Sequence, residues 1–135
     1  MSIQEIFADP IDASLVDLEG ERPVALVVED DPSVRACLRK VLEDVGYRVE
    51  EAVTADRAFE LAVGKSYELV VTDVKTPGDF DGMDLAWGLQ VDWPDTRVIM
   101  ISSKPLSLDH LPERTKLIAK PVDGQKLLRA LEEAS

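Results

Sequence analysis

Two apolar stretches that lead into acidic residues, VALVV at residues 24–28 and YELVVT at residues 67–72, decide the fold of this chain. Each is a short run without polar alternation, as expected for a β-strand that is covered on both faces. The first run leads into Glu29, Asp30 and Asp31, and the second leads into Asp73. We therefore predict two buried strands whose ends carry clustered carboxylates.

Helical patterns separate these strands from further apolar runs. Strands are also predicted over residues 47–52, 98–101 and 117–119. Apolar residues recur at helical spacing after Asp31, after Thr54, from Met83 to about Val91, and after Asp123, and three of these starts carry a side chain suited to capping a helix. Strands that alternate with helices indicate an α/β fold with a parallel sheet and helices on both faces.

Length and composition limit the classes of function. The 135 residues are enough for one domain, and a chain that is 45% hydrophobic can bury a core. The formal net charge of −12 argues against nucleic acid or an anionic membrane as a partner. Single Cys and His residues exclude a disulfide within the chain and a site with two histidines. Neither a membrane-spanning run nor a signal peptide is recognisable, so we expect a cytoplasmic protein.

The first 22 residues differ from the remainder of the chain. They hold six acidic residues and one basic residue, Arg22, which is followed by Pro23. We expect a flexible extension over residues 1–22 and a folded domain over residues 23–135. Ile3, Ile6 and Phe7 lie at helical spacing, so the alternative is an arm that docks on the domain or on a second copy.

Chemically active side chains follow several of the predicted strands. Ligands of such sheets bind at the carboxyl ends of the strands, and that edge should carry carboxylates, hydroxyls and one ammonium group: Glu29, Asp30, Asp31, Asp73, Ser102, Ser103 and Lys120. Clustered carboxylates suit Mg²⁺, and a lysine opposite suits a phosphate group. A spare carboxylate could serve as a nucleophile, so the set fits phosphoryl transfer onto a carboxylate.

Four motifs in order give this set a specific resemblance. VVEDD at residues 27–31, VVTDVKTPG at 70–78, VIMIS at 98–102 and AKP at 119–121 resemble the receiver domain of bacterial two-component response regulators over residues 23–133. The resemblance implies a flavodoxin-like, doubly wound sheet of five parallel strands in the order 2-1-3-4-5. It implies a signalling phosphoacceptor, with no enzymatic activity beyond self-phosphorylation from small donors and autodephosphorylation.

The same resemblance implies a magnesium site. Asp30 would hold Mg²⁺ together with Asp73, and Glu29 would contribute through water. The backbone carbonyl of Lys75 would complete the set of protein ligands.

It also implies the roles of the phosphate-handling residues. Asp73 would be the phosphoacceptor, Lys120 would bind the phosphate, and Ser102 would take the place of the switch hydroxyl. Pro121 matches a proline that often follows a cis peptide bond. The donor would be a histidine kinase or a histidine phosphotransfer protein, and the output would be a contact with a downstream protein. Few residues follow the last predicted helix, so we expect no output domain.

The chain departs from the family pattern in two regions. The loop after Pro77 has three residues, GDF at 78–80, where the family usually has two, and Thr76 replaces a usual methionine. Leu117 occupies the place of the switch aromatic. The stretch between Ser102 and Lys120 is short and holds two prolines, so the fourth helix, around residues 108–111, should be one turn or missing.

Two other functions were weighed. A phosphatase with an Asp nucleophile usually has a second Asp two residues later, where this chain has Lys75. A pseudo-receiver would keep the fold as a protein-binding module and work without phosphorylation. A homodimer through the extension or a helix face is a further option that the sequence does not decide. Cys37, on the apolar face of the first predicted helix, is expected in the core.

Overall fold

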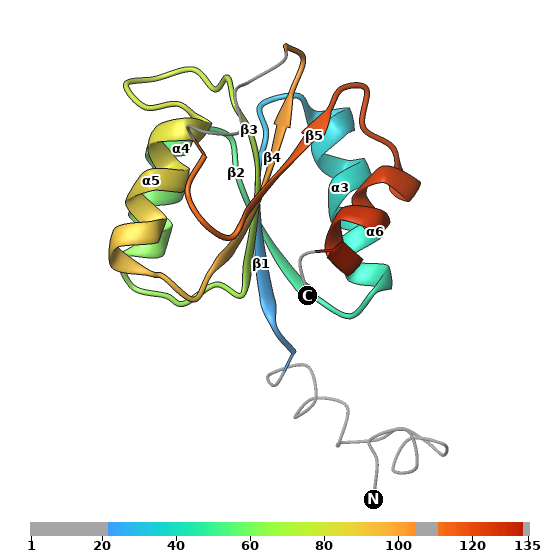
Figure 1. Cartoon of the computed structure of the whole chain (residues 1–135), viewed down its shortest axis with the longest axis horizontal. Coiled ribbons are helices and arrows are strands. Elements are labelled where there is room, and N and C mark those ends of the chain that lie inside the picture. Colours follow the sequence, from blue (N-terminus) through green and yellow to red (C-terminus); the bar gives the residue numbers. More distant parts are fainter. Residues whose placement is uncertain (1–21, 105–110, 134–135) are drawn as a thin grey trace, which may run out of the picture.

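The structure is a computed structural model that describes residues 22–104 and 111–133. Figure 1 shows a sheet with helices on both faces. The described elements in chain order are β1 (Val24–Val28), α3 (Pro32–Asp44), β2 (Arg48–Ala52), α4 (Ala55–Ala62), β3 (Leu69–Asp73), α5 (Gly82–Asp92), β4 (Arg97–Ser102), β5 (Thr115–Ala119) and α6 (Gly124–Glu133). Helices α4 and α5 cover one face, and α3 and α6 cover the other.

The five strands are parallel and lie in the order β2-β1-β3-β4-β5, which confirms the predicted fold class. In this register Asp73 lies beside Ile101, and Ser102 lies beside Ala119. The same edge of the sheet therefore carries the end of β3 with Asp73, the end of β4 with Ser102, and the end of β5 just before Lys120, as predicted.

Side chains along the central strands point alternately to the two faces of the sheet, which explains why these sequences are apolar throughout. Ala25 and Val27 of β1 face the cluster formed with α3 and α6, whereas Leu26 and Val28 face the cluster formed with α4 and α5. All four side chains are at most 1% exposed. Successive strand residues point to opposite faces, so a strand covered on both faces needs apolar residues at every position.

Side-chain caps set the starts of the helices. The Asp31 carboxylate accepts hydrogen bonds from the amides of Ser33 (2.8 Å) and Val34 at the start of α3. Thr54 caps α4, and Asp81 caps α5 in a reciprocal capping box with Asp84. Such bonds satisfy first-turn amides that have no partner within the helix. Asp31 is therefore a cap, and its carboxylate is outside the acidic cluster described below.

Cys37 is exposed, so the prediction of a core position was wrong. The buried stripe of α3 is formed by Leu38 and Leu42, and Cys37 lies on its flank. The fourth-helix prediction, residues 108–111, falls mostly on residues 105–110, outside the described parts of the chain. The extension, apart from Arg22, is also outside them.

Among the described helices, none is both long enough and apolar enough to cross a membrane.

Candidate functional site

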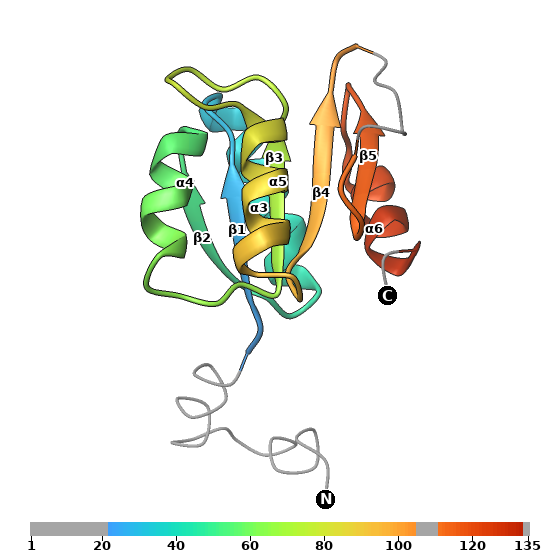
Figure 2. The same ribbon diagram turned by 60° about the vertical axis from the view of Figure 1, so that its left-hand side comes forward.

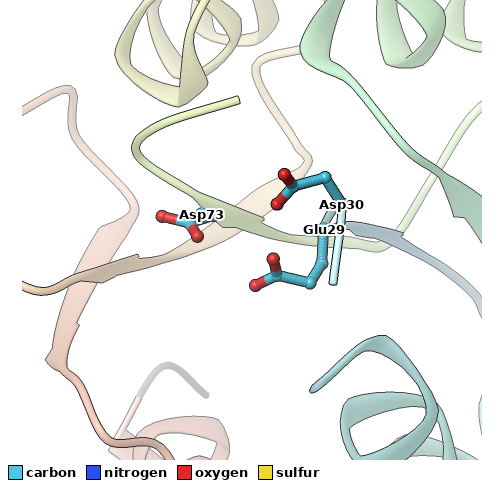
Figure 3. Close-up of side chains that lie close together, drawn as sticks. All are labelled: Glu29, Asp30 and Asp73. Atoms are coloured by element: carbon cyan, nitrogen blue, oxygen red, sulfur yellow. The ribbon is translucent and has the colours of Figure 1, made fainter. Parts of the chain in front are cut away.

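Three carboxylates meet at the carboxyl edge of the sheet. Glu29 and Asp30 directly follow β1, and Asp73 is the last residue of β3. Figure 3 shows the three side chains converging, and one carboxylate oxygen from each lies within 4.8 Å of the others. Glu29 and Asp73 are 1% and 6% exposed, whereas Asp30 is exposed. The structure thus brings together the acidic residues that the sequence predicted as metal ligands.

Glu29 is the least exposed of the three. Its Oε2 accepts a hydrogen bond from the Asp31 amide at 3.2 Å, but its buried Oε1 has no hydrogen-bond partner in the described chain. Burial, with a smaller contribution from the charge of Asp73, raises the pKa of Glu29 from 4.5 to about 7. A buried carboxylate oxygen without a donor is costly, and a proton, a water molecule or a cation would satisfy it.

Asp73 is held from two sides. The Lys120 Nζ lies 2.6 Å from its Oδ2, and the Lys75 amide donates to its Oδ1 at 3.1 Å. The hydrogen bond with Asp73 raises the pKa of Lys120 and keeps the ammonium charged. Lys120 follows β5 and precedes Pro121 across a cis peptide bond, the isomer that the resemblance implied. The side chains of Asp73 and Lys120, 47 positions apart in the sequence, therefore meet as predicted.

The residues fit a hard divalent cation. Mg²⁺ prefers carboxylate and carbonyl oxygens and usually keeps several waters, so it needs few protein ligands. Glu29 Oε1 supplies an unused oxygen, and the Asp30 and Asp73 carboxylates supply others. Lys75 follows Asp73 by two residues and is fixed through its amide, and the use of its carbonyl as a ligand stays a prediction.

Ser102 ends β4 and is 6% exposed. Its hydroxyl donates to the Lys104 carbonyl at 2.6 Å and accepts from the Lys104 amide at 3.1 Å. The hydroxyl is therefore occupied by its own loop. Beside it is a cavity of about 390 Å³, lined by Ser102, Ser103, Lys104, Leu117 and Ala119.

Other residues support the site although sequence reasoning did not single them out. Arg35, on the first turn of α3, donates to the Glu29 carbonyl at 2.9 Å and pairs with Glu51 of β2 at 2.7 Å. It therefore anchors the backbone that carries the acidic pair. Gly82, the first residue of α5, packs directly against the Asp73 carbonyl. Such contacts join residues of different elements, and no local pattern indicates them.

The buried position of Glu29 predicts a pH-dependent stability. A folded-state pKa above 4.5 means that the folded protein holds this proton more tightly than the unfolded chain, so stability falls as pH rises from about 4.5 to about 7. Without divalent cations, Glu29→Gln should therefore raise the free energy of unfolding by about 2 kcal/mol at pH 8 and much less near pH 5. Urea unfolding at several pH values checks this.

Glu68→Gln is the control, because Glu68 is an exposed residue just before β3 at the opposite end of the sheet. Parallel pH profiles for the parent and Glu29→Gln would contradict the predicted destabilisation by Glu29.

Comparison with known proteins agrees with this geometry. The profile of the family described as "Response regulator receiver domain" matches residues 25–132. The response regulator receiver protein CpdR of Brucella abortus is 30% identical over 111 residues, covering 79% of this chain and 92% of the relative. The response regulator protein PilR of Pseudomonas aeruginosa is 33% identical over 111 residues, covering 78% of this chain and 24% of PilR, so the chain spans about a quarter of that relative.

A solved structure has the same fold. The response regulator protein TrrA of Thermotoga maritima, in complex with Mg²⁺ and BeF, is 22% identical, with a TM-score of 0.71 and coverage of 84% of this chain and 99% of that chain.

Proposed function

The chain belongs to the response regulator receiver family, and from that premise we propose that it is a phosphorylation-dependent signalling protein whose acceptor is Asp73. The observation that carries the proposal is the double contact of Asp73 with Lys120 and with the Lys75 amide, beside Glu29 and Asp30. This arrangement leaves one nucleophilic carboxylate among groups that balance its charge. It suits a phosphoacceptor better than a hydrolase, because position 75 holds no second acid.

Magnesium is part of the proposal. Glu29, Asp30, Asp73 and the Lys75 carbonyl would hold the ion, and the unpartnered Oε1 of Glu29 supports this assignment. The complex of TrrA with Mg²⁺ and BeF provides independent support from a protein of the same fold. When bound, the ion would neutralise charge on the incoming phosphoryl group.

The chemical step is an in-line substitution at phosphorus. An oxygen of the Asp73 carboxylate attacks the phosphoryl group of a phosphohistidine, and a P–O bond forms while the P–N bond breaks. The imidazole nitrogen leaves with the electron pair of that bond. Lys120, 2.6 Å from Asp73 Oδ2, can then pair with an oxygen of the new acyl phosphate.

Ser102 would convert the chemical event into a change of shape. Its hydroxyl must release the hydrogen bond that it donates to the Lys104 carbonyl before it can donate to a phosphate oxygen. The loop of Ser102 to Lys104 then changes conformation next to the cavity that Leu117 lines. Two loop states with different affinity for a downstream protein would carry the signal.

The proposed donor is a histidine kinase or a histidine phosphotransfer protein, and the proposed location is the cytoplasm. The formal net charge of −12 for the whole chain also favours a protein with basic groups over nucleic acid as the downstream partner.

Phosphorylation by a small donor tests the proposal. Intact mass after incubation with Mg²⁺ and acetyl phosphate should show one added phosphoryl group. Beryllofluoride with Mg²⁺ should shift the NMR signals of Asp73, Ser102 and Lys104. A beryllofluoride response without added mass would indicate that the protein needs its own kinase. Absence of both responses would overturn the proposal in favour of a pseudo-receiver that binds partners without phosphorylation.

A further inference from the structure

The loop between β3 and α5, residues 74–81, is fastened to the first turn of α4. Figures 1 and 2 show this yellow-green loop passing over the ends of α4 and α5 near the carboxyl edge of the sheet. Residues 77–80 of the loop are all exposed, so little apolar burial holds it in place. Its position therefore depends on specific polar and aromatic contacts.

Thr76 provides the first contact. Its Oγ1 accepts a hydrogen bond from the Ala55 amide at 3.2 Å and donates one to the Phe80 carbonyl at 3.1 Å. Ala55 is the first residue of α4, and its amide has no partner within the helix. Thr76 thus joins both ends of the loop to α4 through a single hydroxyl.

Asp56 provides the second contact. Its carboxylate accepts hydrogen bonds from the amides of Asp79 at 3.2 Å and Phe80 at 3.0 Å. Gly78 has a φ of +113°, and a Cβ there would lie 2.8 Å from the Asp56 carboxylate. The positive φ favours glycine, and a side chain there would displace the Asp56 carboxylate. The Phe59 and Phe80 rings, 5.1 Å apart edge to face, close the same junction.

These contacts lie next to the acceptor. The backbone amide of Lys75 donates a hydrogen bond to Asp73 Oδ1. The next residue, Thr76, accepts a hydrogen bond from the first residue of α4. The one-residue insertion within GDF at 78–80 is accommodated by Asp56, Gly78 and Phe80, so the extra residue need not displace Lys75. The contacts of Thr76 and Asp56 with residues 55 and 78–80 are called the loop clamp below.

We propose that Thr76 and Asp56 are positioning residues: through the loop clamp they hold the Lys75 backbone beside Asp73 in the geometry that the metal and the acyl phosphate require. This inference rests on the proposed function. Residues that orient metal ligands from outside the first coordination sphere commonly change metal affinity by about 10-fold or more when substituted.

Measurement of Mg²⁺ affinity distinguishes a positioning role of Thr76 from a role in stabilising the fold alone. Thr76→Val keeps the shape of the side chain but removes the hydroxyl, and should weaken Mg²⁺ binding about 10-fold in an NMR titration followed at the Asp73, Val74 and Lys75 amides. Thr76→Ser restores the hydroxyl, and should return the affinity to within about twofold of the parent. A purely structural role would lower the melting temperature without a matching change in Mg²⁺ affinity.

Asp56→Asn is the second variant, and Glu60→Gln is its matched control. Asp56→Asn removes one of the two acceptor oxygens, and we expect about threefold weaker Mg²⁺ binding and faster exchange of the Asp79 and Phe80 amide protons. Glu60 lies on the same helix, is exposed, and forms an ion pair with Arg57. Glu60→Gln removes the same charge and should leave both quantities unchanged.

The outcomes are distinguishable. A parent that binds Mg²⁺ while both variants, still folded, bind it equally well overturns the positioning role alone. A parent that binds no Mg²⁺ overturns the proposed function and the positioning role together. If Thr76→Val does not fold, Asp56→Asn decides the question.

Discussion

Asp73→Asn should abolish phosphoryl incorporation while the domain stays folded. Asparagine has the same shape as aspartate, but its amide is not a nucleophile under these conditions. Loss of the attacking group should lower the rate of phosphorylation by at least about 10³-fold, the scale seen when nucleophiles are removed. Intact mass after incubation with Mg²⁺ and acetyl phosphate is the measurement, with circular dichroism to establish that the variant is folded.

Asp95→Asn is the matched control. Asp95 is exposed and lies just before β4, at the opposite end of the sheet from Asp73. The substitution makes the same change of charge, so phosphorylation at the parent's rate is expected. Full phosphorylation of Asp73→Asn would show that another residue is the acceptor, and would overturn the proposed role of Asp73.

Gly82→Ala should destabilise the domain by about 3 kcal/mol, a large effect for one added methyl group. A Cβ on Gly82 would lie 2.1 Å from the Asp73 carbonyl oxygen and 3.0 Å from the Val74 Cα. Both neighbours are backbone, and the Gly82 amide is itself bonded to the Val74 carbonyl at 2.7 Å. Relief of the clash therefore requires movement of the strand end that carries Asp73.

Gly64→Ala provides the control for this substitution. Gly64 follows α4, and a Cβ there would meet no atom within 4 Å. We expect a free energy of unfolding within about 1 kcal/mol of the parent, with a small gain from the reduced freedom of the unfolded chain. Urea unfolding of the parent and the two variants measures these free energies. Equal midpoints for Gly82→Ala and the parent would show that the contact is relieved at little cost in free energy, and would contradict the prediction.

The rate of phosphorylation should also change in Gly82→Ala. Because the added methyl group displaces the Asp73 backbone, phosphorylation of the folded fraction should be slower than in Gly64→Ala. Comparison of Gly82→Ala with Gly64→Ala thus distinguishes the general effect of an added methyl group on phosphorylation from a specific effect at Asp73.

Much of the fold could be read from local patterns. Apolar runs indicated the strands because both faces of a parallel sheet are covered, and Asp31 and Thr54 indicated helix starts because their side chains cap first-turn amides. The strand ends differ from the predictions by small amounts. For example, β5 begins at Thr115 instead of Leu117, because an edge strand tolerates polar residues that an apolar pattern does not detect.

The acidic cluster was predictable for a similar reason. Parallel strands end at one edge, so Glu29, Asp30 and Asp73 were predicted to share that edge once the strands were identified, and the structure brings them together. The strand order and the Lys120 contact came from the family resemblance, since neither follows from spacing alone. Both are present in the structure.

By itself, the sequence determined which elements form and which chemical groups lie at the edge of the sheet, because periodicity, caps and strand ends are local properties. Only the tertiary structure decided that Glu29 is buried with an oxygen that has no hydrogen-bond partner among the described residues, that Cys37 is exposed, and that Asp56 and Thr76 contact the loop after Asp73. The physical reason is that burial and hydrogen bonding depend on which distant segments pack together, and a one-dimensional pattern does not contain that information.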